Sequence, residues 1–310
     1  MRRVNRVAQH PIKGFLAALA AVAVLSVMDA VMKHLVLAIG LVSVSVWRST
    51  TNLSLSAILY LPRRRTWPDR AILWVHVARG VIVTVMAALF FWGIGRVPLA
   101  QAIALTFIAP LIAMLLAAAF LDERVGPSSI AGAVAAFSGV IVIVLGQASA
   151  NVRSDVLLGI AAILASALCY AVNIVLMRRQ ALAAKPLEIN FFQCVTVMIL
   201  WLLAIPLAGL PAPLAGLPAW PGVQWFWILV ATSLSTIGTL LFAWGYARGP
   251  ASYLAVTEYS GFLWAALMGW LVFQERVSSH TLAGAVLIVG GCLIAARGKR
   301  PERPEIDVAA

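Results

Sequence analysis

The residues best suited to binding a charged solute are ionisable side chains inside long apolar segments. Asp29 and Lys33 lie in the first such segment, and Arg48 lies in the second. A spacing of four residues places Asp29 and Lys33 on one face of a helix, so an internal ion pair is the simplest interpretation of the two. Arg48 could pair with Asp29 or face a cavity. Charges are costly within a bilayer and often mark a substrate or ion path, so all three are candidates for coupling or substrate binding.

Glu258 is the acidic residue of greatest interest, because it is the one acid in the apolar segment 251–273. We expect it to line a central cavity beside Tyr253, where it would hold an ammonium group or carry a coupling proton. A structural hydrogen bond to a neighbouring helix is the alternative. Arg48 would then hold a carboxylate, and the two charges together suit an amino acid. Gln193 occupies roughly the position of Arg48 in the second half of the chain.

Other candidates for a cavity wall are aromatic, amide and basic side chains in the remaining apolar segments. They are His76, Arg79, Trp92, Tyr170, Asn173, Trp244 and Trp264. Structural alternatives exist: a histidine commonly packs in a core, an arginine near a span end extends toward lipid headgroups, and tryptophans at span ends form an interfacial belt. Pro110 should kink its helix, because proline lacks the N–H that the helix needs. Pro110 and, in the ninth apolar segment, Gly261 are candidate hinges.

The sequence lacks the motifs of common enzyme and metal-site classes. It has no glycine-rich phosphate loop, and its 4 histidines lack metal-ligand spacing. Cys169, Cys194 and Cys292 stand singly in apolar segments and give neither a disulfide framework nor a metal site. Asn52-Leu53-Ser54 matches a glycosylation acceptor but lies inside an apolar segment, which indicates a chance match. We therefore predict no enzymatic activity, no catalytic residue, no metal and no cofactor.

Composition indicates that the solvent of this chain is a lipid bilayer. Of its 310 residues, 63% are hydrophobic and 11% are charged, whereas a soluble domain carries roughly 25% charged residues. Too little polar surface remains to cover a water-facing globule. The net charge of +12 does not indicate a nucleic-acid partner, because the basic residues stand in short clusters between apolar segments. We predict an all-α integral membrane protein.

Ten apolar segments are long enough to cross a bilayer, which takes about twenty helical residues. They are residues 14–37, 41–61, 71–94, 99–121, 128–147, 156–177, 189–208, 223–246, 251–273 and 279–297. Most of the 23 lysines and arginines fall on the side of the N-terminus, and only Arg96, Arg153 and Arg276 fall in loops on the other side. Positive residues collect on the cytoplasmic side, so both termini should be cytoplasmic. Residues 299–310 form a polar tail that we expect to be disordered.

The two halves of the sequence match each other at one constant offset. The matched elements are Trp92-Gly93 with Trp244-Gly245, Arg96 with Arg248, Pro98 with Pro250, and Glu123-Arg124-Val125 with Glu275-Arg276-Val277. Each repeat holds five spans, and an odd number makes two tandem repeats cross the bilayer in opposite senses. Residues 1–150 and 151–298 should therefore form two inverted five-helix units.

Small residues are concentrated in the last span of each repeat, where they should let helices approach closely. They include Gly132, Gly139, Gly284 and Gly291. We expect these spans to pack against each other or against another copy of the chain.

Short motifs throughout the chain resemble those of the EamA-type drug/metabolite transporters. They are Ala78-Arg79-Gly80, Phe91-Trp92-Gly93, Pro98-Leu99-Ala100, Pro110-Leu111, Leu121-Asp122-Glu123-Arg124-Val125, Ala243-Trp244-Gly245, Gly249-Pro250-Ala251 and Gln274-Glu275-Arg276-Val277. The resemblance extends from Gly14 to Arg297 and implies a bundle of two inverted five-helix repeats that moves small organic solutes. The second half departs from the first, with Phe262 in place of Pro110 and Glu258 in place of Thr106.

The resemblance implies a secondary active transporter in the bacterial cytoplasmic (inner) membrane. We expect an exporter of amino acids that works by alternating access through a central cavity between the repeats. An importer or exchanger of a vitamin or nucleotide-like cofactor is the alternative within this class, and a membrane scaffold or sensor without solute flux is the alternative outside it. The expected partners are a small-molecule substrate and the lipid bilayer, and a homodimer is an open alternative.

Overall fold

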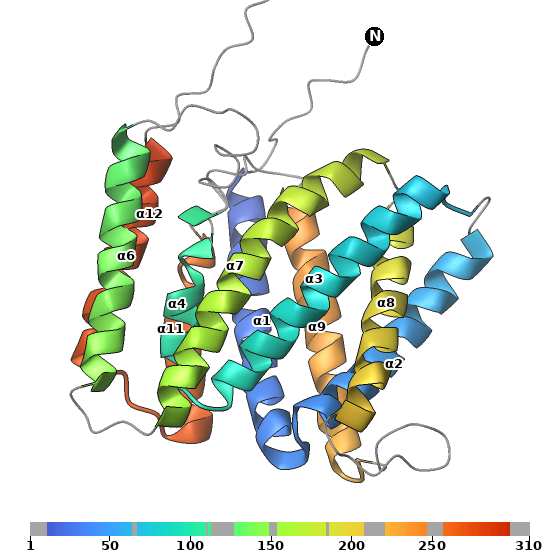
Figure 1. Cartoon of the computed structure of the whole chain (residues 1–310), viewed down its shortest axis with the longest axis horizontal. Helices are drawn as coiled ribbons and strands as arrows, with labels where there is room; N and C mark the ends of the chain where they lie inside the picture. Colours follow the sequence, from blue (N-terminus) through green and yellow to red (C-terminus); the bar gives the residue numbers. More distant parts are fainter. Residues whose placement is uncertain are drawn as a thin grey trace, which may run out of the picture.

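A computed structural model gives the fold of this chain and describes residues 11–63, 67–109, 111–112, 127–148, 154–183, 186–207, 221–246 and 257–297. Every regular element in these residues is a helix (Figure 1). The α-helices are α1 (Pro11–Ile39), α2 (Leu41–Tyr60), α3 (Arg70–Ile94), α4 (Leu99–Thr106), α6 (Pro127–Ala148), α7 (Ser154–Ala183), α8 (Pro186–Leu207), α9 (Gln224–Tyr246), α11 (Gly261–Phe273) and α12 (Ser279–Arg297). A short 3-10 helix, η1 (Leu61–Arg63), follows α2.

The ends of these helices follow from residues that start or stop a helix. Proline is the first residue of α1, α6 and α8. At that position a backbone N–H would have no partner within the helix, so proline's lack of one costs nothing. Gly40 separates α1 from α2 with a φ of 79°, which glycine adopts without steric cost. Ser278 caps α12, because its hydroxyl accepts a hydrogen bond from the N–H of Thr281 at 3.1 Å. Local sequence signals thus account for much of the helix pattern.

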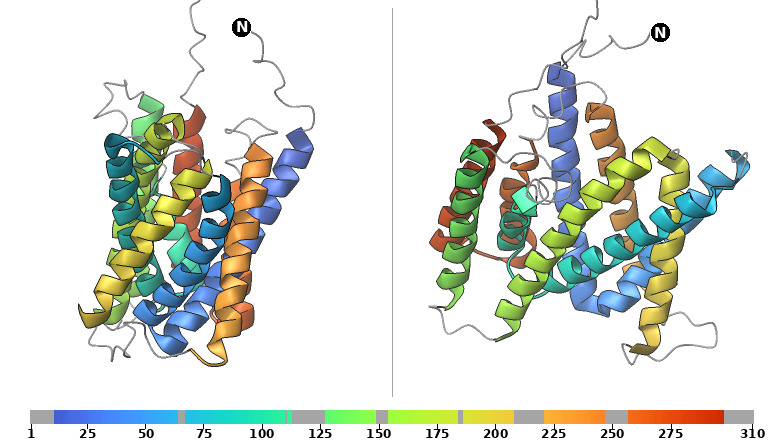
Figure 2. Two further views of the ribbon diagram at one scale, coloured as in Figure 1. Left: turned by 90° about the vertical axis from the view of Figure 1, so that its right-hand side faces the viewer. Right: turned by 45° about the horizontal axis from the view of Figure 1, so that its top comes forward.

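The helices pack in pairs that join the first half of the chain to the second. α1 packs against α9 and α3 against α7, while α2 packs against α8, α4 against α11, and α6 against α12. The α6–α12 pair stands at one edge of the bundle and the α2–α8 pair at the other (Figures 1 and 2). Neither half of the sequence therefore forms its main helix contacts alone.

The bundle has two ends, which are called the Gly40 end and the Pro11 end. The Gly40 end, at the bottom of Figure 1, is where α1 and α3 end and where α4 and α9 begin. The Pro11 end is the opposite one, at which α1 begins.

Glycines bring the α6–α12 pair into backbone contact. A Cβ atom at Gly139 would lie 2.5 Å from the carbonyl oxygen of Gly284, and one at Gly291 would lie 2.5 Å from that of Gly132. The predicted close packing of these small residues against each other is confirmed. Such contact matters in a bilayer, because the hydrophobic effect does not draw helices together there.

Helix α4 begins at the start of the predicted span 99–121, and the described residues 109 and 111–112 of that span are also helical. Helix α4 ends at Thr106, and Phe107 and Ile108 form a turn. Pro110, the predicted site of a kink, lies outside the described residues.

The segment before α11 is interrupted in a similar way. Thr257 and Glu258 are helical, a turn follows at Tyr259 and Ser260, and α11 begins at Gly261, the second hinge candidate. The ring of Tyr259 meets the ring of Phe107 edge to face, with centroids 5.4 Å apart. The two turns are therefore in contact.

Apolar side chains cover the outside of the bundle, while several polar side chains are buried within it. Ile58, Val134 and Leu240 are 68%, 62% and 63% exposed, whereas Lys33 and His76 are 4% and 0% exposed. The interior is mainly apolar as well, and an outer surface with so many large apolar side chains suits a lipid solvent.

Hydropathy identifies the membrane-crossing candidates among the described residues. Five helical segments are long and apolar enough to cross a bilayer: Ile12–Ile39, Arg70–Ile94, Ser154–Asn173, Glu188–Ile205 and Gln224–Phe242. Shorter apolar helices are Ile130–Gly146, Gly261–Phe273 and Ser279–Gly291. The chain is a multi-pass α-helical membrane protein.

Replacing Gly284 by alanine should destabilise the fold. The added Cβ would lie 2.4 Å from Cγ1 of Ile143 and 2.6 Å from the carbonyl oxygen of Gly139, so we expect a loss of roughly 1–3 kcal/mol. Gly290→Ala in the same helix is the control, because a Cβ there meets nothing within 4 Å. Thermal unfolding in detergent should give a lower midpoint for Gly284→Ala than for Gly290→Ala. Equal midpoints would contradict this account of the α6–α12 contact.

Candidate functional site

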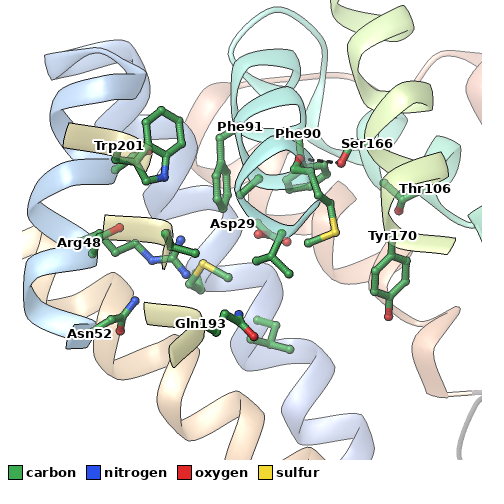
Figure 3. Close-up of a pocket in the computed structure, with 18 of the residues that line it drawn as sticks. Asp29, Arg48, Asn52, Phe90, Phe91, Thr106, Ser166, Tyr170, Gln193 and Trp201 are labelled. Carbon is green, nitrogen blue, oxygen red and sulfur yellow. Dashed lines mark hydrogen bonds between the residues drawn. The ribbon is translucent and has the colours of Figure 1, made fainter. Parts of the chain in front are cut away.

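A cavity of about 490 Å³ lies between the two ends of the bundle and is lined by residues of α1, α2, α3, α4, α7 and α8 (Figure 3). Its volume falls within the roughly 300–1,000 Å³ typical of small-molecule sites. Most of the wall is apolar, and a few polar side chains project from separate helices. This combination suits a small organic ligand that is oriented by a few polar contacts.

Asp29 on α1 and Arg48 on α2 bring an acidic and a basic side chain to the wall of this cavity (Figure 3). The two side chains interact electrostatically. Nη2 of Arg48 lies 3.4 Å from the hydroxyl of Ser235, and its guanidinium carbon lies 5.5 Å from the ring centroid of Phe91. Its buried Nε has no hydrogen-bond partner among the described residues. The cavity wall therefore includes a guanidinium N–H without a protein acceptor and, from Asp29, a carboxyl group.

Amide and hydroxyl groups complete the polar part of the wall. Asn52 on α2 and Gln193 on α8 lie on the same side of the cavity as Arg48 (Figure 3). The hydroxyl of Thr106 donates to the carbonyl oxygen of Ile103 at 2.7 Å, at the end of α4. These groups offer a ligand neutral hydrogen-bond partners in addition to the two charges.

Aromatic side chains form another part of the wall. They are Phe90, Phe91, Tyr170 and Trp201, from α3, α7 and α8. Aromatic surfaces of this kind accommodate apolar or planar parts of a ligand. The cavity thus suits a molecule with a charged end and an apolar or aromatic end.

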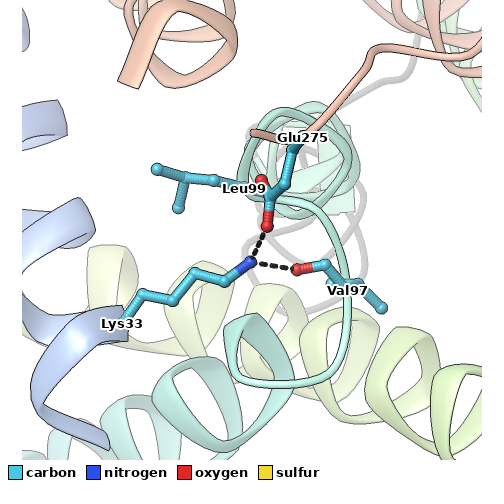
Figure 4. A network of polar contacts seen from close by, with 4 residues as sticks. All are labelled: Lys33, Val97, Leu99 and Glu275. Atoms are coloured by element: carbon cyan, nitrogen blue, oxygen red, sulfur yellow. Dashed lines mark hydrogen bonds and ion pairs between the residues drawn. The ribbon is translucent and has the colours of Figure 1, made fainter. Parts of the chain in front are cut away.

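Lys33 forms an ion pair with Glu275, which lies in the link between α11 and α12 (Figure 4). The Lys33 ammonium also donates to the carbonyl oxygen of Val97 at 2.7 Å. The other carboxylate oxygen of Glu275 accepts a hydrogen bond from the N–H of Leu99 at 2.8 Å. The ion pair of Lys33 is thus with Glu275, and not with Asp29 as the spacing predicted.

Arg79 and Asn173, two candidates for the cavity wall, bind each other instead of lining this cavity. Nε of Arg79 donates to Oδ1 of Asn173 at 2.9 Å and joins α3 to α7. His76 is fully buried, with Nε2 3.3 Å from Oε1 of Glu188 and its ring stacked on Phe192 at 5.2 Å. These contacts join α3 to α7 and α8 on the Pro11 side of the cavity.

Glu258 does not belong to the lining of this cavity. It interacts electrostatically with Tyr170, which does line it. A part for Glu258 in substrate binding or coupling stays a prediction. Tyr253, expected beside it, lies outside the described residues.

Trp92, Trp244, Trp264 and Gly261 are also absent from the lining. The Arg96 guanidinium lies over the Trp92 ring, 3.4 Å from its centroid, at the Gly40 end of α3. Trp244 is 42% exposed near the Pro11 end of α9. These positions agree with the interfacial alternative for Trp92 and Trp244.

Some cavity residues escaped sequence reasoning. Asn52 stands in the sequence as part of a chance glycosylation match, and Phe90, Phe91 and Trp201 resemble any other apolar residue of a span. A signal was available on α2, where Ser45, Arg48, Ser49 and Asn52 recur at helical spacing and form a polar stripe. That stripe would have identified one wall of the cavity.

Two cysteine side chains, Cys169 and Cys194, lie in the described part of the chain. Cys194 lines the cavity, and Cys169 and Cys194 are free thiols. No group of three or more His, Cys, Asp or Glu side chains within the described ranges is arranged to hold a metal ion.

Comparison with known proteins identifies the family. The EamA-like transporter family model matches residues 12–145 and again residues 157–297. The pseudopaline exporter CntI of Pseudomonas aeruginosa is 27% identical over 93% of this chain and 97% of its own length. A riboflavin transporter of Rhizobium johnstonii is 29% identical over 74% of this chain and 72% of its own.

Two further comparisons agree. The aromatic amino acid exporter YddG of Ancylobacter novellus is 26% identical over 75% of this chain and 77% of its own. A solved crystal structure superimposes with a TM-score of 0.57 at 21% identity, over 93% of this chain and 96% of that chain, which supports the fold. Because the family model matches most of the chain and these named relatives are transporters, this protein belongs to the EamA-like transporter family.

Proposed function

We propose that this protein is a secondary active transporter that exports amino acids or similar zwitterionic metabolites across the bacterial inner membrane. The observation that carries the proposal is the presence of Asp29 and Arg48 in one cavity. An amino acid holds an ammonium and a carboxylate close together. Arg48 would bind the carboxylate through its unpartnered Nε, and Asp29 would bind the ammonium. Two relatives are named as exporters, which supports transport out of the cell.

Glu258 has a secondary place in this proposal. Because Asp29 supplies an acid within the cavity, Glu258 is left as a candidate for coupling near Tyr170 rather than for holding the substrate ammonium. The same reasoning leaves Gln193 as a neutral neighbour of Arg48 that can accept or donate a hydrogen bond.

The proposal includes ten spans arranged as two inverted repeats, residues 1–150 and 151–298. The family model matches once in each half, which supports the repeat. Packing offers further support: a Cβ at Gly93 would lie 3.0 Å from the carbonyl oxygen of Gly159, and one at Gly245 would lie 2.9 Å from that of Gly14. Gly93 and Gly245 correspond in the two halves, so α3–α7 and α1–α9 are packed alike. Inverted repeats allow a cavity between them to open to either side in turn.

The first prediction of this proposal is substrate flux. Purified protein in liposomes should accumulate labelled amino acids in a saturable way, and an excess of unlabelled amino acid should compete. Empty liposomes and liposomes with heat-denatured protein are the controls. Folded protein that moves no amino acid of a broad panel would contradict the amino-acid assignment.

Charge removal in the cavity is the second prediction. Arg48→Gln and Asp29→Asn should each lower the apparent affinity for substrate by roughly ten- to a hundredfold, since a hydrogen bond to a charged group contributes about 1.5–3 kcal/mol. Arg70→Gln, at an exposed position at the start of α3, is the matched control and should keep wild-type transport. Wild-type affinity in both cavity variants would remove the basis for zwitterion binding.

Membrane orientation gives the third prediction. In a background without Cys169, Cys194 and Cys292, Val223→Cys at the Gly40 end should react with an impermeant maleimide in intact cells. Arg70→Cys at the Pro11 end should react only after permeabilisation. Both positions are exposed, so access to them depends on the side of the membrane. The opposite labelling pattern would reverse the proposed orientation, which rests on the distribution of lysine and arginine.

A vitamin is the second candidate substrate. The aromatic wall formed by Phe90, Phe91 and Trp201 would suit a flat ring system, and a relative is named as a riboflavin transporter. Riboflavin flux in the same liposomes, with no amino-acid flux, would favour this candidate.

A further inference from the structure

We propose that Lys33, Glu275 and the first turn of α4 form a gate that closes the cavity at the Gly40 end and opens during each transport cycle. The gate rests on the proposed transport function, but its residues are not among those that line the cavity. Its elements are the ion pair between Lys33 and Glu275 and the hydrogen bonds to Val97 and Leu99 (Figure 4).

The position of the cluster is the first argument for a gate. On α1, Lys33 lies one helical turn beyond Asp29 toward the Gly40 end, and on α4, Leu99 lies one turn before Ile103. Asp29 and Ile103 both line the cavity. The cluster therefore lies in the layer between the cavity and the Gly40 end, on two of the helices that form the wall.

The contacts of Glu275 and Lys33 join separate segments of the chain, which also supports a gate. Glu275 accepts the N–H of Leu99, so the carboxylate caps the positive end of α4 while it pairs with Lys33 on α1. The Lys33 ammonium also binds the carbonyl of Val97, in the link between α3 and α4. One carboxylate and one ammonium thus hold three segments together: α1, the start of α4 and the α11–α12 link.

The placement of Glu275 requires local accommodation, which indicates a specific purpose for this carboxylate. Gln274, directly before it, has a φ of 57°, the left-handed conformation that glycine usually occupies at a helix end. Gly269 leaves room for the carboxylate, because a Cβ there would lie 2.7 Å from Oε2 of Glu275. Buried ion pairs are weak sources of stability and better suited to selecting one arrangement over another.

Helix α4 provides the connection between gate and cavity. It is 8 residues long, begins at the Glu275 cap and ends at Thr106, which lines the cavity. A shift of α4 away from α1 would break the contacts of Glu275 and would also move Thr106 and Ile103 in the wall. Water entering from the Gly40 end can hydrate both charges once they separate, so the opening is reversible.

The test measures access to the cavity without any substrate. Cys194 lines the cavity and serves as the reporter once Cys169 and Cys292 are replaced by serine. Glu275→Gln keeps an acceptor for Leu99 but removes the charge, and Lys33→Gln keeps the cap but removes the pair. Each variant should raise the rate of Cys194 modification by an impermeant methanethiosulfonate by roughly tenfold or more. The reagent is applied from the side on which Val223→Cys is labelled.

Two further variants sharpen the result. Glu188→Gln, at the His76 contact on the Pro11 side, is the matched control and should leave the rate unchanged. Gly269→Ala should raise the rate without changing any charge, because its Cβ displaces the Glu275 carboxylate. If Glu275→Gln does not fold, Lys33→Gln and Gly269→Ala provide the same measurement.

The charge-swapped double variant Lys33→Glu with Glu275→Lys tests whether closure needs the cap on α4 or only the ion pair. It restores attraction but places an ammonium at the positive end of α4, where it cannot accept the Leu99 N–H. Because the gate includes the cap on α4, this double variant should only partly restore the low rate of Cys194 modification. Full restoration would overturn the role of the α4 cap.

Unchanged Cys194 modification in folded Lys33→Gln and Glu275→Gln would overturn the gate. This outcome is distinct from failure of the transport proposal, which is judged by flux through the unmodified protein. A faster Cys194 reaction in the variants, in a protein without amino-acid flux, would support the gate and reject only the substrate.

Discussion

Helices within a bilayer are not driven together by exclusion of water, because lipid chains surround an isolated helix as well as a neighbouring helix does. The fold of this chain therefore depends on close contact at small residues. Backbone meets backbone where Gly139 faces Gly284, and a Cβ at Gly93 would nearly touch the carbonyl of Gly159. These contacts hold the α6–α12 and α3–α7 pairs together, whereas α2 and α8 pack through apolar side chains such as Val46 and Trp201, and all of these pairs join the two halves of the chain. The cavity exists because pairs built in this way leave space between α1, α2, α3, α4, α7 and α8.

Buried polar groups in this bundle differ in whether the protein itself supplies their hydrogen-bond partners. Lys33 with Glu275 and Arg79 with Asn173 are bound to protein partners and hold helices together. Removing one partner of a buried ion pair generally costs about 3–5 kcal/mol, because the remaining charge is left uncompensated. Arg48 differs, since its Nε is buried without a partner. A group that is costly to bury and not fully bound by the protein is a natural contact for a ligand.

The relatives similar in sequence to this chain are named for different substrates, and a family of related sequences can serve different functions through different site residues. The wall of this chain combines Asp29 and Arg48 with an aromatic surface. Helix α4 connects that wall to the Glu275 cluster within 8 residues. The same short helix thus contributes Thr106 to the cavity wall and the N–H of Leu99 to the contact with Glu275.

The sequence by itself determined the membrane class, the family resemblance and the close packing of Gly132, Gly139, Gly284 and Gly291. Hydrophobic length, motif order and small-residue spacing are properties of the chain itself. Of the ten predicted spans, five correspond to helical segments that are long and apolar enough to cross a bilayer in the described part of the chain. Charge spacing also indicated that Asp29, Lys33 and Arg48 are special. Only the tertiary structure decided how they are used. Lys33 does not form an ion pair with Asp29, which is four residues away in the sequence. It forms one with Glu275, which is 242 residues away. Membership of the cavity depends likewise on how separate helices face one another, and the hydropathy of a single span carries no information about that.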